Sequence, residues 1–424
     1  MQQQTLPESP EITAASPTVD SDQRENPLRP ETTDPAPGFR TPGPGRFPGF
    51  WKPLKSLFWL VHVAFGTVCL VLILAILAAI PVVNLITLGC LLDAQKRVAR
   101  TGRLRDGFPL MKFAPRLGVI CFFALLFLIP VRILATQANA ALIVRAGSEV
   151  SSDGRVNTLR VVQLLIAAHL IVAIGCGGST ACFLRPLRNL RWLFRQLRTG
   201  QYLRQLDLWA GEAIATLKPL DHFLLGLKAV AGAFCWLVIP TGLLVAYSAP
   251  GRVSPFFGLM SFLGGVVMIP VAAWLPLLQV HQTVTGRFSG IFQVRAARRV
   301  IRQAPLTWMV TTILMYVMTL PLYLAKVRLL PADAFLVLTP IFVLLIYPAR
   351  VLVAWAYHRG MRFDQPAWFG LRWGARLLMI PLLATYAGFL FLTPTISELG
   401  KAAPLENHAF LSPVPYAQWG TTKH

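Results

Sequence analysis

Two groups of arginines have the type and spacing to bind anions. Their spacing of three or four residues places each group on one face of a predicted helix, and leucines and a phenylalanine flank the first group on an adjoining face. The first group is Arg188, Arg191, Arg195 and Arg198, and the second is Arg295, Arg298, Arg299 and Arg302. Basic amphipathic helices lie on anionic headgroups, where each cation contributes about 1 kcal/mol. We expect both groups to contact anionic phospholipid; the alternative is that they only set the topology.

Three further polar side chains fall inside long apolar segments. Arg132 could line a cavity or bind an anionic group, but an arginine there can also extend to the membrane interface. His169 could relay protons or bind a ligand, or it could form a hydrogen bond across a helix interface. Arg350 is expected to extend toward the nearer end of its helix.

Residues with catalytic or metal-binding spacing are missing from the sequence. All six cysteines lie inside or at the ends of apolar segments and none forms a CxxC pair, so we expect neither a disulfide framework nor a zinc site. The motifs HExxH, GxSxG, GxGxxG and the P-loop do not occur. The glycine-rich stretch Gly175–Thr180 is interpreted as close helix packing. No metal or cofactor is expected, and the sequence favours a non-enzymatic protein.

The elements that position these residues are predicted from long apolar blocks in the sequence. The chain has 424 residues, a mean hydropathy of +0.57 and only 14% charged residues, against about 25% in soluble domains. This composition excludes a soluble globular protein. The blocks are 57–92, 117–136, 160–184, 221–248, 256–280, 306–326, 333–357 and 377–395. Most have the length of one tilted spanning helix, which predicts an all-α polytopic transmembrane bundle of about eight spans.

The first apolar block is longer than one span and shorter than two. A helix over 57–80 could precede a tilted half-helix over 81–92, or the chain could form a hairpin that re-enters near Asn84. These alternatives place the N-terminus on opposite sides of the membrane. Residues 1–50 are rich in proline and poor in aliphatic side chains, so we predict a disordered tail there, a transmembrane domain over 51–397 and a short C-terminal tail over 398–424.

The distribution of charge decides what the net charge of +22 means. Alternate loops differ strongly: 23 basic residues lie in one set and six in the other. The basic set is 93–116, 185–220, 281–305 and 358–376, and the other is 137–160, 249–255 and 326–332. This asymmetry is the positive-inside pattern, so the basic loops are predicted to be cytoplasmic and nucleic-acid binding is not expected.

A similar sequence recurs in each basic loop, centred on a glycine. The four glycines are Gly102, Gly200, Gly286 and Gly360, and a threonine or arginine precedes each of them. Glycine commonly ends a helix in the left-handed conformation, and basic residues favour the same end. The pattern fits four helical hairpins that form an internal repeat, or four independent helix ends that happen to share the same capping chemistry.

The stretch from Ile80 to Pro109 contains a Pro-x-x-Asn kink, a glycine-containing helix and a basic exit before a Phe-Pro turn. It resembles the opening of an uncharacterised bacterial family of multi-spanning membrane proteins, a domain of unknown function. Cys90 stands where that family usually has an aromatic residue. The resemblance implies a bacterial cytoplasmic membrane and no particular activity.

Together these patterns predict an integral membrane protein whose basic cytoplasmic face contacts anionic lipid or a partner membrane protein. The alternative is a transporter or permease subunit, favoured by the proline-broken helices, the glycine pattern and Arg132. The alternative requires a water-accessible cavity at mid-depth.

Overall fold

A computed structural model shows an all-helical protein. It describes residues 48–49, 51–144, 153–200, 217–248, 255–327 and 335–396, and the single positions 204, 207, 211, 214, 215, 404 and 408. Among these residues every regular element is an α-helix or a short 3-10 helix, which confirms the predicted class. The predicted tails, 1–50 and 398–424, lie almost entirely outside the described residues.

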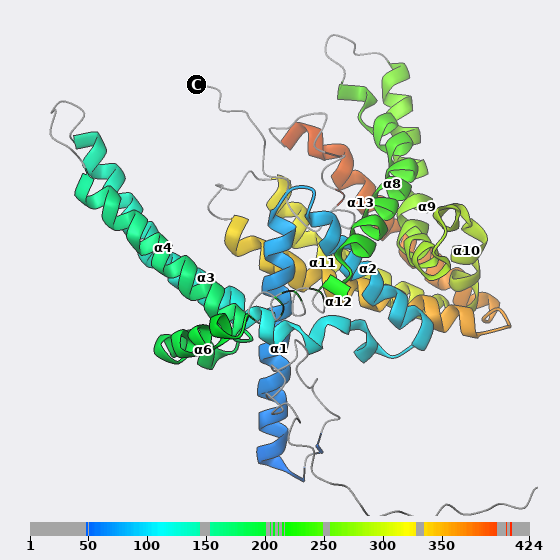
Figure 1. Ribbon diagram of the computed structural model, residues 1–424. Coiled ribbons are helices and arrows are strands. Elements are labelled where there is room, and N and C mark those ends of the chain that lie inside the picture. Colours follow the sequence, from blue (N-terminus) through cyan, green and yellow to red (C-terminus); the bar gives the residue numbers. More distant parts are fainter. Residues whose placement is uncertain are drawn as a thin grey trace, which may run out of the picture. The chain divides into compact units, whose positions relative to one another are not determined.

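Within the described residues, eight helices are long and apolar enough to cross a membrane. They are α1 (Pro53–Ala79), α3 (Ala114–Val144), α4 (Asp153–Gly175), α8 (Pro219–Leu244), α9 (Pro255–Thr285), α11 (Pro305–Val327), α12 (Phe335–Arg362) and α13 (Phe369–Ile396), most of them labelled in Figure 1. Their number agrees with the predicted eight spans, and each overlaps one predicted apolar block. The chain is therefore a multi-pass integral membrane protein.

Prolines act at two kinds of position in these helices. Several helices begin on proline, where the missing N–H has no partner to lose. Some helices also continue through an internal proline, as α9 does at Pro276. The carbonyl of Ala272, four residues earlier, is then left without its helical donor. The Tyr316 hydroxyl of α11 donates a hydrogen bond to this carbonyl at 3.2 Å, so a neighbouring helix satisfies the freed group.

The first apolar block divides into two helices. Helix α1 ends at Ala79, the backbone turns through Val82 at φ +68°, and α2 (Asn84–Thr101) begins directly afterwards. Most of α2 is buried, and the hydroxyl of its Thr87 donates to the Leu74 carbonyl of α1 at 3.1 Å. The break lies where Pro81 predicted it, but the second helix is longer than the expected half-helix and is not one of the eight spans.

Helix α12 lies at the centre of the packing. In its most apolar window 56% of the residues are buried, against 6% in α4 and 11% in α3. It packs mainly on α2, α11 and α1, while α2 also packs closely on α8. At this crossing Gly89 faces the backbone of His222, and Gly226 faces the carbonyl of Leu85. Glycines let the two backbones approach more closely than any side chain would permit.

The predicted end of the apolar block over 160–184 is wrong. A single helix was expected over 160–184, but α4 ends at Gly175. A turn over 176–179 then leads into the short helix α5 (Thr180–Leu184) and the helix α6 (Pro186–Arg198). Gly177 and Gly178 in this turn have φ of +109° and +62°, so they reverse the direction of the chain. Gly178 also packs closely against Ile120 of α3, as the predicted helix packing of this stretch requires.

Candidate functional site

Helix α6 carries the first group of predicted arginines on an exposed surface. Arg188, Arg191, Arg195 and Arg198 are all exposed. The apolar side chains of the same helix are exposed as well, Leu187 by 75% and Phe194 by 60%. A helix that is exposed on both its basic and its apolar face has the pattern of an interfacial helix, with the apolar face among acyl chains and the cations at the headgroups.

One side chain of α6 is fully buried and connects the helix to α5. Asn189 is the residue of α6 that is buried, and its amide nitrogen donates a hydrogen bond to the carbonyl of Cys182 in α5. At the other end the chain leaves the helix through Gly200, at φ +66°. The Asn189 contact therefore attaches α6 near its start, and most of the helix surface faces outward.

Helix α10 (Val294–Gln303) carries the second group of arginines in a different setting. Its apolar face is buried in the protein through residues such as Val300 and Ile301. Its four arginines are exposed, but Arg298 lies over the Trp274 ring at 5.1 Å and Arg299 forms an ion pair of 3.7 Å with Asp364. The prediction treated the two helices alike, whereas only α6 leaves its apolar face exposed.

The glycine pattern marks three helix ends and one helix interior. Gly102, Gly200 and Gly286 have φ between +66° and +71°, as predicted for helix ends. Gly360 instead lies inside α12, which continues to Arg362, and it packs against Val300 of α10. The predicted fourth helix end is therefore wrong at Gly360, where glycine permits close packing of two helices.

Two of these helix ends meet near the end of α12. Arg100 donates to the carbonyl of Val284 at 3.0 Å, joining the end of α2 to the end of α9. The ring N–H of His358 in α12 donates to the Ala99 carbonyl at 2.9 Å. These contacts bring three of the four recurring sequences together, in α2, α9 and α12.

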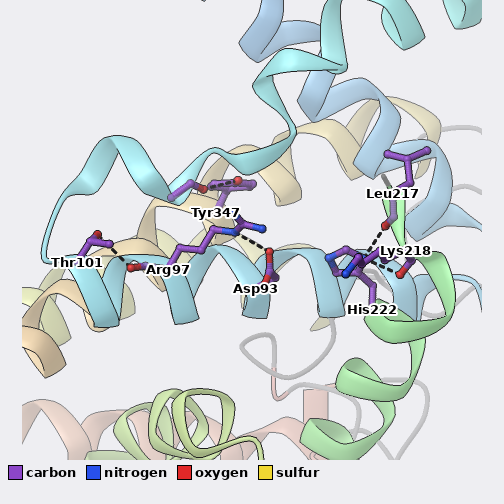
Figure 2. Close-up of polar contacts among 8 residues, drawn as sticks. Asp93, Arg97, Thr101, Leu217, Lys218, His222 and Tyr347 are labelled. Atoms are coloured by element: carbon purple, nitrogen blue, oxygen red, sulfur yellow. Dashed lines mark hydrogen bonds and ion pairs between the residues drawn. The ribbon is translucent and has the colours of Figure 1, made fainter. Parts of the chain in front are cut away.

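Figure 2 shows the polar side chains along α2 and at the start of α8. Asp93 accepts a hydrogen bond from Arg97 at 2.8 Å, one turn along the same helix, and the Tyr347 hydroxyl of α12 donates to the Gly107 carbonyl at 2.6 Å. The Nδ1–H of His222 donates to the Leu217 carbonyl at 2.8 Å. Because each of these groups is held by an internal partner, the cluster positions helices and has the character of a structural site.

Arg350 is buried at the middle of α12, and the prediction that it extends to the interface is wrong. Only 1% of its surface is exposed. Its guanidinium donates to the Gln95 side-chain oxygen at 3.3 Å, and the Gln95 amide donates to the Arg350 carbonyl at 3.0 Å. This reciprocal pair joins α12 to α2, and a charge buried in this way is costly unless it is well partnered.

A second buried polar group connects α9, α12 and the segment before α10. The His281 ring lies 2.6 Å from the Tyr357 hydroxyl through Nδ1 and 2.7 Å from the Gln293 oxygen through Nε2. Since an amide oxygen only accepts, the Nε2–H of His281 donates to Gln293, and Nδ1 shares a hydrogen bond with the tyrosine hydroxyl. Earlier in the same helix, both amide atoms of the fully buried Gln279 have no hydrogen-bond partner within the described residues.

The predicted intramembrane residues lie away from both buried polar groups. Arg132 is exposed on α3. His169 of α4 is partly buried; its Nε2–H donates to the Phe183 carbonyl at 3.1 Å, and its ring lies edge-on to Phe127. This contact joins α4 to α5, which is the role of a hydrogen bond across a helix interface.

A cavity of about 250 Å³ lies between α8, α9, α11 and α13. Its lining is mainly apolar, with Tyr316, Tyr323 and Tyr386 among the few polar residues. Their hydroxyls are bonded to Ala272, Phe389 and His408 respectively. Neither Arg132 nor His169 lines this cavity, so it offers a ligand mainly hydrocarbon contacts.

No residue cluster of the described chain suits a metal ion, since no group of three or more His, Cys, Asp or Glu side chains is close enough. Comparison of the chain with protein-family models, with curated proteins and with solved structures finds no match.

The sequence did not predict three features of the structure: the Gln95–Arg350 pair, the His281 group and the contacts of the Gly175–Thr180 stretch. The Gln95–Arg350 pair and the His281 group join residues far apart in the chain. The third carried a local signal, two cysteines that flank a glycine-rich turn, but their spacing matches no familiar motif.

Proposed function

We propose that this membrane protein binds anionic lipid headgroups through α6, which lies along the membrane surface. The observation that supports the proposal is the combined exposure of four arginines and of Leu187, Phe194 and their apolar neighbours on one helix. In water such an apolar face would be unfavourable, whereas at a membrane surface both faces find suitable surroundings. The positive-inside pattern favours the cytoplasmic leaflet for this contact, and the resemblance over 80–109 favours a bacterial cytoplasmic membrane.

The expected contribution of the arginines is substantial. At about 1 kcal/mol for each cation near an anionic surface, four cations contribute about 4 kcal/mol, which corresponds to roughly a thousandfold preference for anionic over neutral lipid at low salt. The interaction is screened over about 10 Å at 0.1 M salt, so the preference should fall as the ionic strength rises.

The test compares two quadruple variants of the full chain. In the first, Arg188, Arg191, Arg195 and Arg198 are changed to Gln, and in the second Arg295, Arg298, Arg299 and Arg302 are changed to Gln. Both variants lose four positive charges, but only the first alters a helix with an exposed apolar face. Each protein is reconstituted in mixed phosphatidylglycerol and phosphatidylcholine bilayers, and spin-labelled lipids report the headgroup preference of the lipid in contact with it.

We expect the α6 variant to lose most of its preference for phosphatidylglycerol and the α10 variant to lose less. Equal losses would mean that net charge, and not α6, attracts the lipid. An unchanged preference in the α6 variant would refute the proposal and direct attention to an acidic partner protein as the ligand of the arginines.

A transporter or permease subunit is the second candidate, and the cavity between α8, α9, α11 and α13 favours it. Proline-containing helices α9, α11 and α13 contribute to its wall, as they do in many solute carriers. This function requires water in the cavity. Thr319 lines it, so Thr319→Cys in a chain without other cysteines should react with a membrane-impermeant maleimide; reaction with lipid-soluble maleimide alone would exclude an aqueous path.

A further inference from the structure

The turn between α4 and α5 places two cysteines side by side. After α4 the amide of Gly178 donates back to the Ala173 carbonyl at 3.0 Å, and the two left-handed glycines reverse the chain. Helix α5 then begins at Thr180 and brings the Cys182 sulfur to 3.5 Å from the carbonyl oxygen of Cys176. The turn therefore places the two cysteines next to each other although five residues separate them in the sequence.

The surroundings of Cys182 favour a negative charge on its sulfur. The Ser179 hydroxyl lies 3.1 Å from this sulfur and can donate to it. The Arg116 guanidinium adds a favourable positive charge. In its thiol form Cys182 can donate to the Cys176 carbonyl at 3.5 Å, which is a weak contact, or to the Ser179 oxygen. When Cys182 is a thiolate, the Ser179 hydroxyl donates to it and the Arg116 charge stabilises it.

Helices α3 and α6 hold the turn in place. The buried Arg116 of α3 donates to the Gly177 carbonyl at 2.5 Å. Asn189 of α6 donates to the carbonyl of Cys182, and Phe183 stacks on Phe123 of α3 with ring centres 4.8 Å apart. A pair of thiols positioned in this way needs little rearrangement to react with each other.

The pKa of the Cys182 thiol is lowered and that of the Cys176 thiol is raised, so Cys182 is the better nucleophile of the two. The hydrogen bond from Cys176, followed by those from Ser179 and the charge of Arg116, lowers the pKa of Cys182 to about 5 although burial opposes the shift. The same hydrogen bond, together with burial, raises the pKa of Cys176. By contrast, burial above all raises the pKa of Cys90 in α2 to about 12, which makes that thiol inert.

We propose that Cys176 and Cys182 form a reactive thiol pair that a hydroperoxide oxidises to a reversible disulfide. The Cys182 thiolate attacks the terminal oxygen of the hydroperoxide, the O–O bond breaks, and an alcohol or water leaves after taking up a proton. Cys182 is then a sulfenic acid. The Cys176 sulfur attacks the Cys182 sulfur, its proton and the hydroxyl leave as water, and the disulfide forms.

The charged and titratable groups that face this pair come from each element packed against it. They are Arg116 of α3, His169 of α4 and Arg188 of α6. The two arginines make the electrostatic surroundings of the pair positive, which favours the thiolate over the thiol.

The first test measures the pH dependence of alkylation at Cys182 in the full-length protein in detergent, by mass spectrometry of its peptide. With a pKa near 5, about nine-tenths of Cys182 is thiolate at pH 6, against about one-thousandth for an ordinary thiol with a pKa near 9. The rate at pH 6 should thus be close to its high-pH plateau. The comparison is made within one site, so differences in accessibility between cysteines do not enter.

The second test treats the protein with hydrogen peroxide. The wild type should yield a peptide in which Cys176 and Cys182 are joined, and a reductant should reverse it. In Cys176→Ser the reaction should stop at the sulfenic acid, which dimedone traps on Cys182. Ser179→Ala should keep the disulfide but move the alkylation midpoint to higher pH, because one donor to the thiolate is lost.

Two results would overturn the inference. An alkylation midpoint near 9 would show that Cys182 is not the attacking thiolate. Peroxide treatment that leaves the wild type without the joined peptide would show that the two thiols do not form a pair. Because neither readout depends on lipid, failure of these tests leaves the lipid proposal for α6 unaffected.

Discussion

The crossing of α2 and α8 predicts that two similar substitutions in one helix will have opposite consequences. Gly226 and Gly242 both lie in α8. A Cβ on Gly226 would overlap the Leu85 carbonyl of α2, whereas a Cβ on Gly242 has nothing within 4 Å. We therefore expect Gly226→Ala to destabilise the protein and Gly242→Ala to leave it unchanged or slightly more stable.

The magnitude follows from what the neighbouring atoms can do. In both variants alanine favours the helix by about 1 kcal/mol over glycine, so this contribution cancels in the comparison. At Gly226 the obstacle is backbone and cannot rotate away, so α2 and α8 must separate by about an ångström. Such a gap forfeits a quarter to a half of the dispersion energy across the buried contact of Leu88, Leu92 and Ala229. We expect a difference of about 1–3 kcal/mol between the variants.

The assay is thermal unfolding of the purified protein in detergent, followed by circular dichroism at about 222 nm and by the accessibility of buried cysteines. Gly226→Ala should unfold several degrees below Gly242→Ala, and Gly89→Ala, which meets the His222 backbone, should behave like Gly226→Ala. Equal unfolding temperatures for all three variants would contradict the close approach of the two helices at their glycines.

Three further predictions concern other contacts. Asn189→Ala removes the bond to the Cys182 carbonyl and should speed hydrogen exchange over α6 at least tenfold, measured by mass spectrometry, with little change in global unfolding. Arg350→Leu leaves the Gln95 side-chain oxygen without its arginine donor, while the Gln95 amide keeps its bond to the carbonyl of residue 350, so the cost in thermal unfolding should be about 1–3 kcal/mol. Adding Gln95→Leu should recover part of the loss, and strictly additive costs would argue against the pair. As the pH falls through about 5, alkylation of Cys182 should slow tenfold per unit, since its thiolate is lost below the lowered pKa; a rate that is already falling below pH 8 would contradict this.

The spans were predictable because their causes are local. A helix that crosses hydrocarbon needs about 20 apolar residues and satisfies its own backbone, so hydropathy and length suffice. The break near Pro81 was predictable for the same reason, since proline removes a donor within its own helix. Local information could not predict the structure of the segment after the break, because the burial of α2 depends on its packing against α8 and α12.

Arg350 shows where reasoning from single residues fails. An arginine two or three turns from a helix end is expected to reach the interface, because a lone buried charge is costly. Its partner Gln95 lies 255 residues earlier, and the sequence gives no sign that the two meet. The two groups of arginines show the same limit: their helical spacing is alike, and only the packing of Val300 and Ile301 separates α10 from α6.

Because all six cysteines lie inside or at the ends of apolar segments, the sequence suggests ordinary buried thiols, and Cys90 has this character. Cys182 does not, because its acidity comes from neighbours on a turn that the predicted helix over 160–184 would not contain. A correct position for the end of α4 at Gly175 was therefore the missing step, and the consecutive glycines at 177 and 178 were the signal for it.

The hydrogen bond from Tyr316 to the Ala272 carbonyl has a mechanical consequence. The Ala272 carbonyl that Pro276 frees in α9 is satisfied by a donor that belongs to another helix, so any rearrangement that separates α11 from α9 would leave this carbonyl unsatisfied in hydrocarbon, at a cost of several kcal/mol. We therefore expect the two helices to move together as one unit in any conformational change.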